Sequence, residues 1–219
     1  MNHNNVIRRT EKYVQESLKD LESGHNWFHI TRVRKNALLI AKKENADVFI
    51  VELAALLHDI GDSKFHKGDE SVGPTMAQDF LESLKVKKET VEHIVKIIRY
   101  MSFKNSLEAK SDSFDSLEMK IVQDADRLDA IGAIGIARAF NYGGFKNREI
   151  YDPEISPNLK MDKEEYKNSS APTINHFYEK LLLLKDSMNT SFGKKMAQKR
   201  HKFMEEYLEQ FYDEWQGLK

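Results

Sequence analysis

The sequence has 219 residues, no cysteine, and 34 Lys and Arg against 35 Asp and Glu, which gives a formal net charge of -1 at pH 7. This length suits one domain that buries roughly 70% of its unfolded surface, and the charge balance argues against proteins that coat nucleic acid or bind membrane surfaces electrostatically. The lack of cysteine excludes disulfides, thiol nucleophiles and thiolate metal sites, and no secretory signal or membrane-length apolar run is visible, so we expect a soluble cytoplasmic protein.

Apolar residues recur at steps of three and four along most of the chain, while strict alternation is rare. This pattern predicts an all-α fold. The predicted helices span residues 5–21, 26–44, 47–60, 70–85, 88–102, 115–140, 175–188 and 191–216.

Several predicted helices carry signals at their ends. Asp47 should cap the helix over 47–60, and Gly61 lies where that helix should stop. Asp115 followed by Glu118 has the spacing of a capping box. The last helix carries an apolar stripe that should dock on the other helices, made of Met204, Leu208, Phe211 and Trp215.

The segment 141–174 differs from the rest because it holds three of the four prolines and a Gly-Gly pair, without a clear period. A segment of this length without regular structure is usually functional or disordered. Two interpretations are open, a flap over a site and a plain surface loop or disordered stretch.

Two histidines lie among apolar residues. The helix over 47–60 is apolar nearly all round, so it should be buried, and it ends in His58 and Asp59. His29 lies in the phrase GHNWFHITRV, among Trp27 and other apolar side chains. A buried core does not hold such groups without partners.

A third group of ligand type comes from the segment DADRLDAIGAIGIA, residues 124–137. If the helix runs unbroken to residue 140, Asp126 shares a face with small residues that let another helix approach and that would draw its carboxylate inward. These small residues are Ala130, Ala133 and Ala137.

Three predicted helices thus present two imidazoles and two carboxylates on their buried sides. A His-Asp dipeptide alone is weak evidence, and a structural His–Asp pair is the alternative interpretation. Burying two carboxylates without a cation costs several kcal/mol, a cost that a divalent metal removes. The mixed N/O donor set favours Mn²⁺, with Mg²⁺, Fe²⁺, Co²⁺ and Ni²⁺ as alternatives.

The order H…HD…D, together with the phrases AALLHDIGD and IVQDADRLDAIGAIGIAR, resembles the HD-domain metal-dependent phosphohydrolase superfamily, in particular its small stand-alone bacterial hydrolases. The resemblance implies an all-α HD-domain helical bundle over 1–219 as a single domain. Its core would span about 20–140, with the helices over about 175–216 packed on it. It also implies four metal ligands, His29, His58, Asp59 and Asp126.

The last of these ligands has a rival. Asp126 is preferred because the family's last ligand opens a D-x-L segment, here Asp126-Arg127-Leu128, and Asp124 remains the alternative. Related sequences often have His-Ser-Phe where this chain has Met101-Ser102-Phe103, which favours a single metal ion.

Further residues could act on the substrate. In some family members an acid three residues after the HD aspartate is catalytic, and here that position is Asp62, which could instead be a solvated aspartate after Gly61. The cations closest in sequence are Lys64 and Arg127, as catalytic candidates, and Arg32, as a substrate-binding one. Each cation could equally be a structural ion-pair partner.

Two other residues are candidates for substrate contact. Asp129 could bind substrate hydroxyls or orient a metal ligand. His66 is the other candidate, although a surface-loop histidine is its simpler interpretation.

The resemblance implies a metal-dependent phosphohydrolase with a small phosphorylated substrate, a nucleotide above all. Pyrophosphohydrolysis of nucleoside triphosphates is the leading hypothesis, and 5′-nucleotidase and cyclic-nucleotide or alarmone hydrolase activities are alternatives. A competing hypothesis is a non-enzymatic nucleotide sensor with a structural metal. We expect no nucleic-acid partner and no membrane partner, and a homodimer is compatible with this interpretation.

Overall fold

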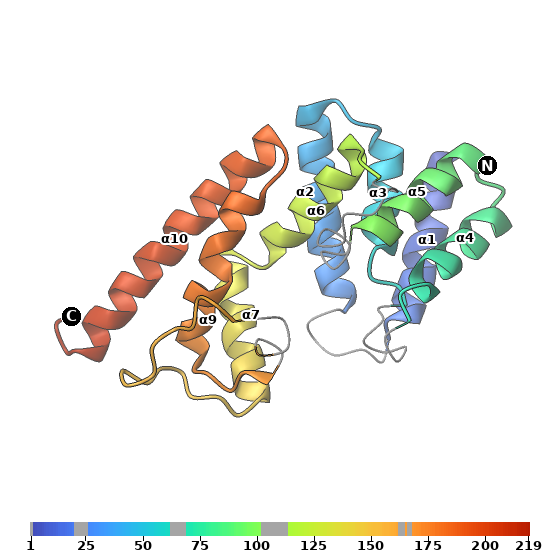
Figure 1. The fold of residues 1–219 in the computed structure, drawn as a ribbon. Helices are drawn as coiled ribbons and strands as arrows, with labels where there is room; N and C mark the ends of the chain where they lie inside the picture. The colour runs from blue at the N-terminus through green and yellow to red at the C-terminus, as the bar shows by residue number, and fades with distance from the viewer. Residues whose placement is uncertain (1, 20–25, 62–68, 102–113, 162–164, 166–167) are drawn as a thin grey trace. The chain divides into compact units, whose positions relative to one another are not determined.

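The computed structural model describes residues 2–19, 26–61, 69–101, 114–161, 165 and 168–219 (Figure 1). Within these residues the chain forms nine α-helices and one 3₁₀-helix, without a β-strand. The predicted all-α fold is therefore confirmed. None of the described helices combines the length and the hydropathy that a membrane crossing requires.

The helices fall into two compact units, residues 1–126 and 127–219, and the boundary lies within α6. That both units make one domain stays a prediction. The first unit contains α1 (His3–Ser17), α2 (Trp27–Glu44), α3 (Val48–Leu57), α4 (Val72–Ser83), α5 (Lys88–Tyr100) and most of α6 (Leu117–Asp129). The second contains α7 (Gly132–Phe145), α9 (Thr173–Glu179), the 3₁₀-helix η3 (Leu181–Ser187) and α10 (Ser191–Trp215).

Helix α3 is the core of the first unit, where it packs against α1, α2 and α5 (Figure 1). Its side chains are apolar on all sides except at Glu52, and the residues from Leu53 to Leu57 are fully buried. Arg34 of α2 forms ion pairs with Glu52 and with Glu11 of α1. Burial alone would lower the pKa of Arg34, but the hydrogen bonds and charges of the two glutamates outweigh it and raise this pKa. The charged group of α3 is thus compensated, and it ties three helices together.

The two ends of α3 follow local capping rules. The Asp47 carboxylate accepts hydrogen bonds from the backbone N–H groups of Phe49 (2.9 Å) and Ile50 (3.1 Å), which confirms it as the N-cap of α3. The chain turns away after α3 at Gly61, whose φ of +69° lies in the left-handed region.

The start of α6 differs from the predicted capping box. Ser116, not Asp115, caps the helix, since its hydroxyl accepts the Met119 N–H at 3.1 Å. Glu118 reaches other helices instead: one carboxylate oxygen accepts the Asp47 N–H at 3.3 Å and the other lies 3.5 Å from His93 Nε2. Glu118 therefore links α6 to the start of α3 and to α5.

The helix predicted over 115–140 is wrong, because the chain breaks between α6 and α7. Gly132 has a φ of +74°, and a Cβ there would lie 3.0 Å from the Arg200 side chain. The Arg200 guanidinium donates to the Leu128 carbonyl at the end of α6. Burial lowers the pKa of Arg200, and the charge of Asp129 offsets part of this effect. The inference that Asp126 shares one helical face with Ala133 and Ala137 fails for the same reason.

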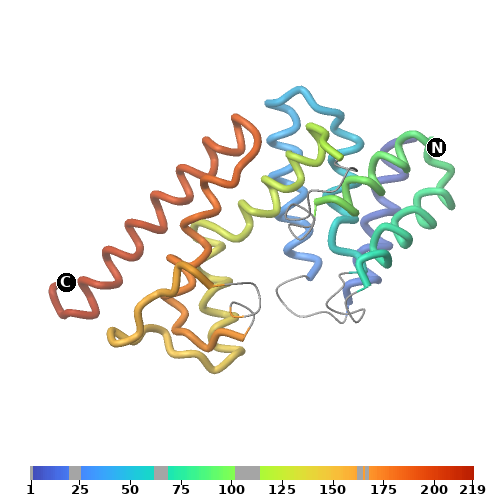
Figure 2. Tube along the Cα trace, in the orientation of Figure 1, coloured from blue at the N-terminus to red at the C-terminus, as the bar shows by residue number. Residues whose placement is uncertain are grey.

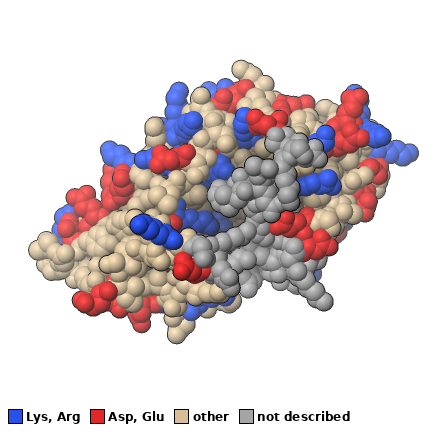
Figure 3. Space-filling view, viewed as in Figure 1, with Lys and Arg blue, Asp and Glu red and all other residues tan. Residues whose placement is uncertain are grey.

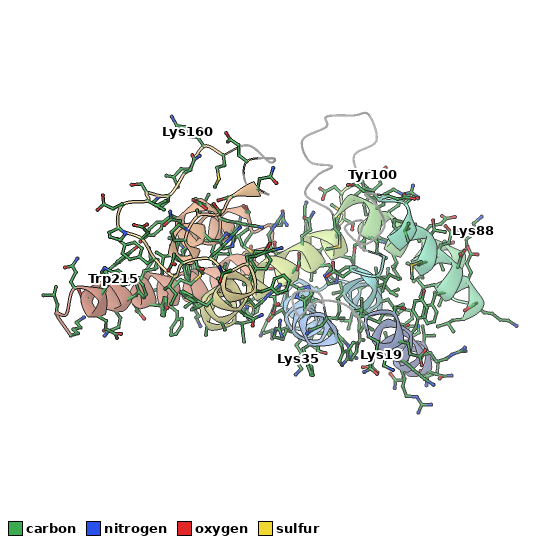
Figure 4. The ribbon with its side chains drawn as sticks, turned by 90° about the horizontal axis from the view of Figure 1, so that it is seen from below. Lys19, Lys35, Lys88, Tyr100, Lys160 and Trp215 are labelled. Atoms are coloured by element: carbon green, nitrogen blue, oxygen red, sulfur yellow. The ribbon has the colours of Figure 1, made fainter. Side chains whose placement is uncertain are left out.

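In the second unit, α10 packs against α7 and η3. Its predicted stripe is confirmed at Met204 and Leu208, which are buried, whereas Trp215 near the end of the helix is 54% exposed (Figure 4). The Trp215 ring meets that of Tyr151, with centroids 5.1 Å apart.

Residues 146–161 form an irregular segment that leaves α7 and returns towards α9 (Figure 2). The Asn175 side chain donates to the Ile155 carbonyl at 2.9 Å, and Glu179 accepts the Asn158 N–H at 3.1 Å. The described part of this segment is therefore packed on α9. The predicted irregular stretch begins later than residue 141, because α7 continues to Phe145.

Two glycines offer a test of the close approach next to α3. A Cβ on buried Gly73 would lie 2.5 Å from the Ile60 carbonyl oxygen, so Gly73→Ala must push the turn after α3 away from α4. We expect a loss of about 1–3 kcal/mol in the free energy of unfolding, measured by chemical denaturation.

The matched control is Gly144→Ala in α7, where a Cβ meets nothing within 4 Å. This change should be neutral or stabilising by up to about 1 kcal/mol. Equal stability of the two variants would contradict the packing described for Gly73.

Candidate metal centre

Three helices of the first unit bring two imidazoles and two carboxylates together. His29 Nε2 lies 3.5 Å from Asp59 Oδ2 and 3.4 Å from Asp126 Oδ1. His58 Nε2 lies 3.7 Å from Asp59 Oδ1 and 4.0 Å from Asp126 Oδ1. The structure thus gathers all four residues predicted as ligands.

Local structure aims both histidines at this point. Asn26 caps α2 by accepting the N–H groups of Phe28 and His29, each at 3.1 Å, which fixes His29 in the first turn. His58 follows the last residue of α3, and its Nδ1 lies 2.9 Å from the Ala55 carbonyl oxygen. Because a carbonyl only accepts, Nδ1 carries the proton and Nε2 presents its lone pair to the cluster.

Burial differs between the two kinds of donor. The side chains of His29 and His58 are 2% and 3% exposed, whereas those of Asp59 and Asp126 are 15% and 44% exposed. The imidazoles therefore form a closed floor, and the carboxylates form a rim that solvent reaches. Asp126 is not drawn into the core, contrary to the inference from its small neighbours.

These residues fit a divalent cation. One ligand atom from each of His29, His58 and Asp126 lies within 4.8 Å of the other two, and Asp59 adjoins both imidazoles. Two neutral imidazoles and two carboxylates would balance a charge of +2, and such N/O sets suit first-row divalent metals. Hydrogen bonding of the second ring nitrogen, as in His58, is the usual support of a metal-bound histidine.

The structure also bears on the two rival aspartates. Asp126 stands beside both imidazoles, whereas Asp124 is fully buried. Residues two positions apart on a helix point about 200° away from each other. Asp124 therefore faces away from the side of α6 that carries Asp126.

The other predicted site residues are placed as follows. Asp62, Lys64 and His66 lie outside the described residues. Arg32 is half-buried on α2, one turn after His29. Their roles, and that of Arg32, stay predictions.

Arg127 and Asp129 have partners within the second unit. Arg127 donates to the Ser187 carbonyl at 2.6 Å. Asp129 is buried and forms an ion pair with Arg138. The structure gives both residues a structural contact, and their contact with substrate stays a prediction.

Sequence reasoning missed the residues that orient the ligands. The Asn26 cap had a readable signal, since Asn is a preferred N-cap and precedes an amphipathic helix. The link from Glu118 to His93 and Asp47 had none, because these residues are far apart in the sequence.

A comparison with family models matches residues 27–131 to the HD domain. YpgQ of Bacillus subtilis (strain 168) is 40% identical over 208 residues, covering 94% of this chain and 92% of that protein. Protein L803 of Acanthamoeba polyphaga mimivirus is 31% identical over 200 residues, covering 79% and 81%.

Solved structures agree with this result. An HD-superfamily hydrolase from Bacillus thuringiensis superposes with a TM-score of 0.79 at 43% identity, covering 98% of this chain and 99% of that one. Bacillus subtilis YpgQ in complex with ADP superposes with a TM-score of 0.74 at 36% identity, covering 98% and 97%.

Metal binding can be measured through stability. A ligand present at 100 times its dissociation constant stabilises a folded protein by about 2.7 kcal/mol, so Mn²⁺ should raise the unfolding temperature of the wild type. Asp59→Asn and Asp126→Asn each remove a carboxylate charge from the cluster, and we expect them to lose most of this gain.

Asp79→Asn is the matched control, because Asp79 is an exposed aspartate on α4 and makes the same change in charge. It should respond to Mn²⁺ as the wild type does. An undiminished response in the two cluster variants would show that the ion binds elsewhere.

Proposed function

The chain belongs to the HD domain superfamily, and from this membership we propose that it is a metal-dependent phosphohydrolase that converts nucleoside triphosphates to monophosphates and pyrophosphate. At the coarser level the chain is an HD-superfamily hydrolase with a candidate His-His-Asp metal site. The substrate, the bond that is cleaved and the metal are the proposed parts.

The observation that carries the proposal is that the carboxylates of Asp59 and Asp126 are partly exposed to solvent, whereas the two imidazoles beside them are buried. A purely structural metal site is normally closed by protein ligands, whereas a catalytic one keeps positions open. A divalent cation held there would polarise a phosphoryl oxygen and make water more acidic. The 44% exposure of the Asp126 side chain supports access of solvent, and so of a substrate, to this carboxylate.

The remaining chemistry is assigned to residues of this chain. Asp62, three residues after Asp59, would accept the proton of the attacking water. Arg32 lies one helical turn from His29 and, with Lys64 and Arg127, would stabilise the negative charge that develops on the phosphoryl oxygens. Attack at the α-phosphorus would break its bond to the bridging oxygen, and pyrophosphate would leave.

A nucleotide is favoured as substrate because YpgQ, 36% identical to this chain in the aligned structure, was crystallised with ADP. ADP contains both a base and a diphosphate, so the likeness supports the nucleotide class and does not select the triphosphate. The triphosphate assignment rests on the family resemblance of the sequence.

The product pattern tests the assignment. Purified protein with Mn²⁺ should convert a nucleoside triphosphate to monophosphate and pyrophosphate, without free phosphate. In H₂¹⁸O the label should enter the monophosphate, because water attacks the α-phosphorus. Label in pyrophosphate would instead place the attack at the β-phosphorus. Release of inorganic phosphate together with a nucleoside would contradict the proposal and favour a nucleotidase.

Variants separate catalysis from metal binding. Asp62→Asn should lower kcat by about 10²–10⁴-fold while stabilisation by Mn²⁺ is retained, since loss of a general base has this magnitude. Asp59→Asn should lose both activity and stabilisation, and Asp79→Asn should lose neither. Folded, metal-binding wild type that turns over no nucleotide would instead support a sensor.

A further inference from the structure

Apart from the candidate metal centre, a pocket with the chemistry of an anion site lies in the unit formed by residues 127–219, at the end of α7. Its volume is about 250 Å³. This is below the roughly 300–1,000 Å³ of sites for whole organic ligands, and it suits a phosphate or diphosphate group. Its walls are Tyr142, Lys146, Asn147, Arg148, Ser169 and Ser170.

Two cations of this pocket stand over one aromatic ring. Lys146 Nζ lies 5.7 Å and Arg148 Cζ lies 5.6 Å from the centroid of Tyr142, and Lys146 Nζ is also 5.1 Å from that of Phe145. Cation–π contacts position a charge without neutralising it. Among the residues that the structure describes, neither cation forms an ion pair with a carboxylate, and Lys146 and Arg148 are the charged groups of the pocket lining.

The pKa of His176 reflects positive charge in this part of the second unit. Burial, followed by the charges of Lys180 and Arg148, lowers the pKa of His176 to about 4. His176 is therefore neutral near pH 7, and the positive charges that act on it are those of Lys180 and Arg148.

The opposite wall of the pocket carries the hydroxyl groups of two serines. The Arg148 guanidinium donates to the Ser169 carbonyl, which joins the two walls. The Ser169 hydroxyl oxygen accepts the Ala171 N–H at 3.2 Å, so its own hydrogen can point elsewhere. Ser170 adds a second hydroxyl to the lining. Hydroxyl and guanidinium donors are the groups that bind phosphate oxygens.

Lys146 and Arg148 follow the C-terminus of α7, and positive charges stabilise a helix C-terminus whether or not they bind an anion. That effect acts on any cation near the last turn. It does not account for the shared ring, the hydroxyls of the opposite wall or the pocket between them.

We propose that this pocket binds a phosphate or diphosphate group through Lys146, Arg148 and the serine hydroxyls. The rings of Tyr142 and Phe145 are 49% and 64% exposed next to it, so a nucleotide could place its base on them while its diphosphate occupies the pocket. Pyrophosphate and a nucleoside diphosphate share the chemistry that the pocket recognises. Neither source requires the metal centre to be catalytic.

Binding is measured directly, by calorimetric titration of the full-length, metal-free protein with pyrophosphate and, separately, with ADP. Lys146→Ala/Arg148→Ala should weaken pyrophosphate binding at least tenfold. The matched control Lys160→Ala/Lys194→Ala removes the same charge from exposed positions, with Lys160 at the outer tip of the irregular segment (Figure 4), and should stay within twofold of wild type.

Two further variants guard against misfolding and against confusion with the metal centre. Lys146→Glu changes one exposed side chain, keeps the Arg148 bond to Ser169, and should also abolish binding. Asp59→Asn should bind pyrophosphate as the wild type does, whether or not the proposed activity exists. Loss of binding in Asp59→Asn, or no binding by the wild type, would overturn the proposal.

The two sources are told apart by the rings. If ADP binds more tightly than pyrophosphate and Tyr142→Ala/Phe145→Ala removes the difference, the pocket is a nucleotide site. Equal affinities that the ring variant leaves unchanged make it a site for the free anion. Unchanged pyrophosphate affinity in both Lys146 variants would refute the pocket in either form.

Discussion

Two imidazoles that are almost entirely removed from water face two carboxylates where α2, α3 and α6 meet, and this contact constrains the first unit. Polar groups are tolerated at the edge of an apolar core only when each has partners, so the three helices have little freedom to shift. Helix α3 supplies the apolar centre and ends in His58 and Asp59, which puts the most hydrophobic and the most polar parts of the unit next to each other. The supporting contacts, from the Asn26 cap to the turn at Gly61, hold the helix ends that carry the donors.

Charged side chains away from the candidate metal centre also have partners of opposite charge. Arg34 joins two glutamates from α1 and α3, and Asp129 is paired with Arg138 in the second unit. On the face drawn in Figure 3, acidic and basic side chains of the described residues are interspersed. In the pocket beside Tyr142, both Lys146 and Arg148 lie over the aromatic ring of Tyr142.

The sequence predicted a helix well where nearby residues, such as a capping side chain, set its ends. Asp47 caps α3 as expected, and α2 and α10 match their predicted spans within a residue. The failures involve contacts between residues that are distant in the sequence. The helix over 115–140 is broken before Gly132, whose φ is +74°, and Arg200, 72 positions after Leu128, donates to the carbonyl at the end of α6. Glu118 leaves the predicted capping box for Asp47 and His93, which offer it a backbone N–H and an imidazole from other helices.

The sequence by itself determined the all-α class, because helical periodicity is local. It also predicted the four residues of the candidate metal centre, from the few side-chain types that bind a divalent cation and from the family resemblance. The tertiary structure decided which groups orient those residues, how open the rim at Asp126 is, and where α6 ends. It also brought Lys146 and Arg148 opposite two serines from beyond the irregular segment. These features depend on distances across the fold, and no periodicity along the chain encodes such distances.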